Sequence, residues 1–79
     1  MALVTTITQQ RLEKDVSHKL AQCTYTVVTS SDGKHYLQLD TYGSSERKIK
    51  GKKSQSIRFS PAAILRLYQI INEHQLSHQ

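Results

Sequence analysis

The chain has 79 residues, 37% of them hydrophobic and 22% charged, and its formal net charge at pH 7 is +5. This length is enough for one small domain and excludes a second. The single cysteine excludes a disulfide within the chain, and no apolar run reaches the length of a membrane span. The N-terminal residues do not resemble a secretory signal, so we expect an intracellular protein, whether cytoplasmic, nucleoid-associated or nuclear.

A domain of this size needs a further source of stability, because so small a core supplies only about 3 to 5 kcal/mol. A metal is not expected to supply it, since His74 and His78 lie four residues apart without an evident third ligand. No cofactor-binding motif is present either. Self-association remains, and the sequence therefore predicts a homodimer.

The N-terminal segment is compatible with more than one structure. Leu3, Val4 and Ile7 permit a short strand, whereas Leu12, Val16 and Leu20 lie four residues apart, as on the thin apolar edge of a helix. Strand, short helix and partial disorder all stay open for this segment.

A strand is predicted over residues 23–29, CTYTVVT, because β-branched and aromatic residues alternate there between two faces. Cys23 and Tyr25 are expected in the core. Asp32-Gly33 follows, and its glycine supplies the positive φ that a tight hairpin turn requires.

The next predicted strand, residues 35–42, places Leu37 and Leu39 on one face. A one-residue slip would turn both leucines to water and bury Asp40, so the register is strongly favoured. We therefore expect Asp40 and the two tyrosines of this strand on the outer, polar face.

A further strand over residues 56–59 leads into a helix over residues 61–74. Ser60 is a good N-cap residue, and proline suits the first helical position. Apolar residues then recur every three or four positions and form a stripe wider than one small sheet face can cover. The residues predicted to form a dimer interface on this stripe are Ile64, Leu67, Tyr68 and Ile71.

These elements predict an α+β fold, a small antiparallel sheet of three to four strands with a C-terminal helix on one face. Residues 1–21 form an N-terminal segment, and residues 22–79 form the single domain.

The net charge is concentrated between Ser44 and Arg58, a stretch that holds six Lys or Arg and one Glu. Charges elsewhere in the chain cancel. Clustered cations release counterions when they neutralise phosphates, so this stretch predicts a nucleic-acid partner. The residues expected to contact phosphates are Lys34, Arg47, Lys48, Lys50, Lys52, Lys53 and Arg58, and those expected to stack on bases are Tyr36 and Tyr42.

Catalysis is not expected. The sequence has no phosphate-binding glycine loop, no carboxylate pair in a catalytic context and no Ser-His-Asp order. We therefore predict a protein that is not an enzyme and needs no metal or cofactor.

The stretches GKHYLQLDTY, Gly51-Lys52-Lys53 and SIRFSPAAILRLYQII follow one another within residues 32–71, a little over half of the chain. Their order resembles the C-terminal domain of the positive-cofactor-four-like transcriptional coactivators. The resemblance implies a four-stranded antiparallel sheet backed by one helix and dimerised through the helices. It also implies basic sheet surfaces that bind single-stranded or unpaired DNA, with a role in transcription or DNA maintenance.

Two alternatives stay open. A helix over Gln9 to Ala21 would give the order α-β-β-β-α, the plan of a double-stranded RNA-binding domain. The other alternative is a protein-interaction module whose basic stretch docks on an acidic protein partner, because charge alone does not distinguish phosphates from carboxylates.

Overall fold

The computed structural model describes residues 1–43 and 53–79. It confirms the predicted α+β fold, in which a four-stranded sheet is followed by one helix. The elements are β1 (Ala2–Val4), β2 (Cys23–Thr29), β3 (His35–Tyr42), β4 (Lys53–Phe59), α1 (Pro61–Glu73) and the short 3-10 helix η1 (Leu76–His78).

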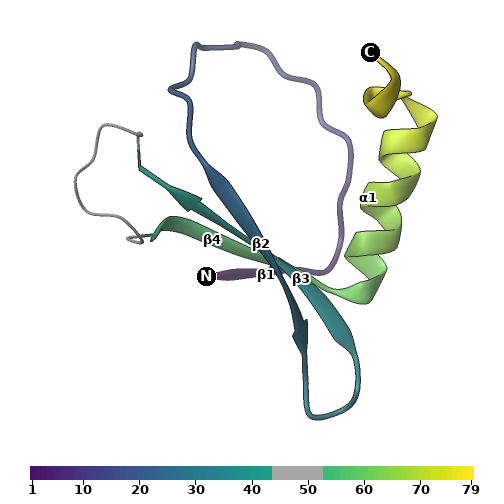
Figure 1. Ribbon diagram of the computed structural model, residues 1–79. Helices are drawn as coiled ribbons and strands as arrows, with labels where there is room; N and C mark the ends of the chain where they lie inside the picture. Colours follow the sequence, from purple (N-terminus) through teal and green to yellow (C-terminus); the bar gives the residue numbers. More distant parts are fainter. Residues whose placement is uncertain (44–52) are drawn as a thin grey trace.

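The strands lie in the order β1-β4-β3-β2, so the N-terminal strand and β2 form opposite edges of one sheet (Figure 1). β2, β3 and β4 pair antiparallel, as predicted, whereas β1 pairs parallel to β4. The backbone N–H of Ser60 donates to the carbonyl of Val4 at 3.0 Å, which ties the N-terminal strand to the start of the helix.

The register of β3 and β4 separates an apolar face of the sheet from a polar face. Leu37 pairs with Phe59 and Leu39 pairs with Ile57, so four large apolar side chains lie on one side. The alternate residues, from Tyr36 to Tyr42 on β3, lie on the other side, as the leucine spacing predicts.

The turn between β2 and β3 contains the glycine with positive φ that the sequence predicts. Gly33 has a φ of 85°, and its N–H donates to the carbonyl of Ser30 at 3.0 Å. Asp32 accepts hydrogen bonds from the Ser30 hydroxyl and from the backbone N–H of Lys34, and these bonds lower the pKa of its carboxyl. The turn thereby fixes the register of the hairpin.

Helix α1 begins where the sequence predicts. The Ser60 side chain accepts a hydrogen bond from the backbone N–H of Ala63 at 3.2 Å, and Pro61 occupies the first turn. The helix packs against β3 and β4, and Ala63 is fully buried there. None of the helices in the described residues is long and apolar enough to cross a membrane.

Residues 5–22, here called the N-terminal arc, connect the two edges of the sheet and contain no helix or strand (Figure 1). The alternative helix over Gln9 to Ala21 is therefore wrong, and with it the α-β-β-β-α order. Leu12, Val16 and Leu20 are 64%, 64% and 92% exposed. An isolated helix of this length is marginal unless its apolar edge packs against another element, and these three side chains are largely exposed.

The core includes less of β2 than the sequence predicts. Tyr25 is 72% exposed, and Cys23 is exposed as well, so the prediction that both lie in the core is wrong. Both are on the apolar face of the sheet, but α1 packs over β3 and β4 and leaves β2 uncovered.

Removing the N-cap hydroxyl tests how far α1 depends on it. We expect Ser60→Ala to lower the free energy of unfolding by about 1 kcal/mol, because the Ala63 N–H loses its acceptor. Urea unfolding monitored by circular dichroism at one fixed protein concentration measures the change. Ser60→Asp keeps an acceptor and serves as the control; equal stability of Ser60→Ala and the wild type would contradict the capping role.

Candidate nucleic-acid interface

The polar face of the sheet is organised around one buried carboxylate. Asp40, on β3, is only 2% exposed. The Ser56 hydroxyl donates to its Oδ1 at 2.5 Å, and Gln38 Nε2 lies 3.2 Å from each of its oxygens. Lys53 Nζ lies 3.4 Å from Oδ2 and forms a salt bridge with it.

These donors decide the charge state of Asp40. The hydrogen bond from Ser56 is the largest of the effects that lower the pKa of its carboxyl, and Gln38 and Lys53 act in the same direction. Burial raises the pKa but is outweighed. Asp40 is therefore a stable anion at neutral pH, and Lys53 is its charge partner.

Gln38 also orients the side chain of Arg58. Because the amide nitrogen of Gln38 faces Asp40, its Oε1 points to β4 and accepts from Arg58 Nε at 3.1 Å and from Nη2. A guanidinium has five N–H donors, and Gln38 accepts two of them. No other described residue accepts from Arg58, so its remaining donors can serve an anion.

Tyr42 lies at the end of β3, beside Lys53 in the sheet register. Its hydroxyl is 3.0 Å from Oγ1 of Thr24, a bond that holds the half-buried ring across β2 and β3. The pairing of β3 and β4 shifts at this point, and Ser54 bonds to Thr41 at 3.1 Å. Such an irregularity changes the direction in which side chains at the end of a strand pair point.

The structure brings only some of the predicted site residues together. Tyr42, Lys53 and Arg58 share the polar face, and Tyr36 is on the same face but at the far end of β3, about 20 Å from Tyr42. Lys34 is exposed in the β2–β3 turn. The remaining predicted residues lie outside the described part of the chain: Arg47, Lys48, Lys50 and Lys52.

The described residues on either side of residues 44–52 are neighbours in the sheet. Gly43 follows β3, Lys53 begins β4, and Tyr42 pairs with Lys53. Tyr42 and Lys53 therefore lie side by side, next to the Asp40–Lys53 salt bridge.

The predicted dimer residues all lie on α1. Ile64, Leu67 and Ile71 are half-buried, whereas Tyr68 is 64% exposed. Packing against the sheet thus already involves part of this stripe, and Tyr68 projects away from it.

Sequence reasoning missed the three residues that build the network, Gln38, Asp40 and Ser56. The signal was present in the alternation of β3 and β4, since the leucine register that pairs Leu39 with Ile57 also pairs Asp40 with Ser56. Among residues 1–43 and 53–79, no group of three or more His, Cys, Asp or Glu side chains could hold a metal ion.

Comparison with known proteins gives no match: no protein-family model fits the chain, and no curated protein or solved structure is significantly similar to it. Any function must therefore be argued from the residues of this chain.

The pKa of Asp40 can be checked directly. We expect its carboxyl to titrate below the ordinary value of 3.8 in an NMR pH titration, and Ser56→Ala to raise that pKa because the strongest donor is lost. Because the pKa is lower in the folded than in the unfolded state, this group stabilises the fold at neutral pH. That contribution is lost as the pH falls through the folded-state pKa.

The matching stability measurement uses Asp40→Asn, which cannot ionise. Its unfolding free energy should depend less on pH in the acid range than that of the wild type. An identical pH dependence of the two proteins would show that the network does not hold Asp40 ionised.

Proposed function

We propose that this protein is a non-catalytic nucleic-acid-binding protein that binds single-stranded or unpaired DNA, in a transcription or DNA-maintenance role. The observation that carries the proposal is the concentration of the net charge between Ser44 and Arg58, a segment that follows β3 and includes most of β4. A chain that is neutral elsewhere presents its positive charge to a partner at one place.

Lys53 and Arg58, on the polar face, differ in how much of their positive charge is free for a ligand. Lys53 is 51% exposed and is paired with Asp40, so much of its charge is neutralised locally. Arg58 is bound to a neutral amide and keeps its full charge, with a guanidinium oriented by two hydrogen bonds. Arg58 is therefore the described residue best suited to grip a phosphate, because an oriented planar guanidinium can bind two of its oxygens at once.

An unpaired strand suits this surface better than a duplex. Tyr42 offers an aromatic ring beside the start of the basic stretch, and stacking on such rings requires bases that are free of a partner. Tyr36 and Tyr42 are too far apart to hold neighbouring bases, so each ring acts on its own.

Removing three cations of the basic stretch tests the electrostatic part of the proposal. We expect Lys50, Lys52 and Lys53 replaced together by Ala to weaken oligonucleotide binding for every sequence. The slope of log affinity against log salt should become less negative by about 1.4, because Lys50 and Lys52 can each account for a phosphate contact that contributes about −0.7 on a single strand, whereas Lys53 is already paired with Asp40. Fluorescence polarisation at several ionic strengths, with single-stranded DNA, duplex DNA and duplex RNA of equal length, gives both quantities.

The matched control removes the same number of cations from the N-terminal arc, by replacing Arg11, Lys14 and Lys19 with Ala. It should leave the slope nearly unchanged. Equal losses in the two triple variants would mean that only total charge matters. A flat salt response of the wild type with every oligonucleotide would direct the search to an acidic protein partner.

Stacking is tested separately at Tyr42. We expect Tyr42→Ala to weaken single-strand binding roughly 5- to 140-fold, since a stacked base contributes about 1 to 3 kcal/mol. Tyr42→Phe loses only the hydroxyl bond to Thr24 and should bind nearly as the wild type does. If the two variants lose affinity equally, the hydroxyl bond and not the ring is what binding needs.

A further inference from the structure

Strand β2 forms one edge of the sheet, and its register shows which of its backbone groups bond to β3. At one end the N–H of Tyr42 donates to the carbonyl of Gln22 at 3.0 Å, and at the other the N–H of Ser30 donates to the carbonyl of Lys34 at 2.9 Å. In an antiparallel ladder, hydrogen-bonded pairs alternate with non-bonded pairs, and the register between these two ends is regular. The even-numbered residues of β2 therefore bond to β3.

The odd-numbered residues of β2 point their backbone N–H and C=O groups away from β3. These residues are Cys23, Tyr25, Val27 and Thr29. Among the described strands, β3 is the one that pairs with β2. The outward groups repeat about every 7 Å along the strand. They form a straight row of donors and acceptors that another extended backbone can complete.

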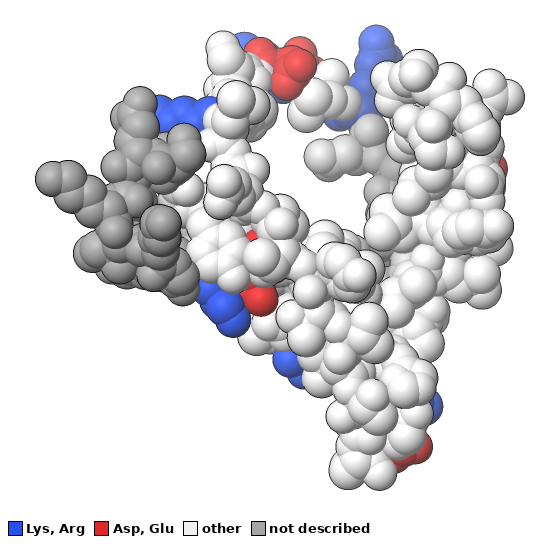
Figure 2. All heavy atoms as spheres, viewed as in Figure 1, with Lys and Arg blue, Asp and Glu red and all other residues white. Residues whose placement is uncertain are grey.

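This edge lacks the features that usually prevent an added strand. Edge strands are commonly short, bulged, or interrupted by charged residues and proline. β2 has seven residues, CTYTVVT, and none of them is charged or a proline. Figure 2 shows a mainly uncharged surface over the lower part of β2, down to the hairpin turn. By its sequence, β2 is thus open to strand addition.

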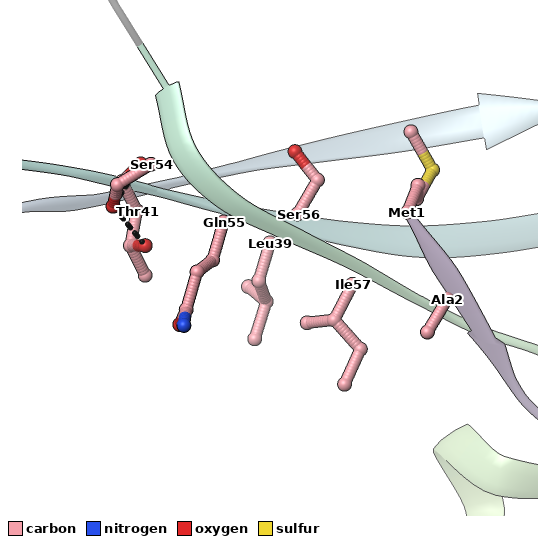
Figure 3. A pocket seen from close by; sticks show the side chains of 8 residues that line it. All are labelled: Met1, Ala2, Leu39, Thr41, Ser54, Gln55, Ser56 and Ile57. Carbon is pink, nitrogen blue, oxygen red and sulfur yellow. Dashed lines mark hydrogen bonds between the residues drawn. The ribbon is translucent and has the colours of Figure 1, made fainter.

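The opposite edge of the sheet is protected. β1 has only three residues and covers the last part of β4, where Ala2 pairs with Ile57. The part of β4 beyond β1 begins with Lys53, and its pairing with β3 shifts after Thr41. Figure 3 shows Ala2 close to Ile57 and, further along, the bond between Ser54 and Thr41. Of the two edges in the described part of the chain, β2 is therefore the long and regular one.

The side chains of β2 define what an added strand must carry. Tyr25 is 72% exposed and Val27 is 61% exposed on the apolar face of the sheet. Thr24 and Thr26 are exposed on the polar face. An added strand continues both faces, so its side chains lie beside those of β2. Residues opposite Tyr25 and Val27 should be large and apolar, and residues opposite the threonines should be polar.

We propose that β2 is a docking edge for an extended segment of a partner protein, which adds one strand to the sheet through main-chain hydrogen bonds. The segment is about as long as β2 and alternates apolar with polar residues. The edge itself indicates a polypeptide, because an extended polypeptide has N–H and C=O groups at the required spacing, whereas a nucleic-acid backbone presents phosphates.

Docking at β2 leaves the candidate nucleic-acid interface accessible. Lys53 and Arg58 lie on β4, which β3 separates from β2. The domain can therefore hold a partner protein at its edge and a nucleic acid on its polar face at the same time. The docking proposal does not depend on nucleic-acid binding, and the experiments below contain no nucleic acid.

Amide hydrogen exchange of the full chain, followed by NMR, tests the edge directly. Without a partner, the N–H groups of Tyr25 and Val27 should exchange rapidly and those of Thr24 and Thr26 slowly. The probe is a synthetic peptide with the sequence of residues 35–42, HYLQLDTY, because β3 is the antiparallel neighbour that β2 already accepts. At millimolar concentration the peptide should slow exchange at positions 25 and 27 roughly tenfold.

Two results of this experiment would overturn the proposal. One is that the peptide leaves the exchange rates at positions 25 and 27 unchanged. The other is that both amides already exchange slowly without peptide, and more slowly as the protein concentration rises. A second copy of this chain would then occupy the edge in place of a partner protein.

Proline substitutions distinguish the two sides of β2. Val27→Pro removes an N–H that points away from β3, so the domain should fold but no longer bind the peptide. Val27→Ala keeps this N–H and is the matched control, which should still bind. Thr26→Pro removes a donor of the ladder to Gln38 and should destabilise the domain. Unchanged peptide binding by folded Val27→Pro would contradict docking at this edge.

Backbone methylation of the peptide gives the same test without changing the protein, in case Val27→Pro does not fold. In the register that places leucines beside Tyr25 and Val27, the N–H groups of peptide residues Leu37 and Leu39 face β2. N-methylation of these two should abolish binding, and N-methylation of Tyr36 and Gln38 should leave it intact. The reverse pattern would mean that the peptide replaces β3 in the sheet, which overturns the proposal.

Discussion

The pairing of β3 with β4 is the constraint on which the rest of this structure depends. Leu37 and Leu39 meet Phe59 and Ile57 on one face, and the same register leaves Asp40 beside Ser56 on the other. One set of backbone bonds therefore builds the apolar core and the polar network together. A slip by one residue would expose the leucines and bury the carboxylate without its donors, so each face reinforces the register of the other.

Most of the fold could be predicted from local signals. The Asp32-Gly33 turn, the alternation in β3 and the Ser60-Pro61 cap each act over a few residues, where sequence and conformation are directly coupled. Tyr25 was placed in the core because strand alternation indicates a face but not whether another element covers it. Coverage depends on where α1 lies, and no short pattern encodes that.

The candidate site, like the fold, could be predicted only in part from the sequence. Arg58, Lys53 and Tyr42 were found from their residue types and alternation. The role of Asp40 was not found, because a lone acid on a polar face ordinarily faces water. Its burial follows from three donors on two strands that only the folded register brings together, Gln38, Ser56 and Lys53. The candidate site is thus a carboxylate that orients its neighbours on β3 and β4.

The parallel pairing of β1 with β4 has a consequence for the order of folding. Ala2 lies opposite Ile57, so this contact closes most of the chain into a loop, whereas β2, β3 and β4 are joined through near neighbours in sequence. Closing a long loop costs entropy that later contacts must repay. We therefore expect the hairpins to form first and the N-terminal strand to dock afterwards, once the start of α1 offers it the Ser60 N–H.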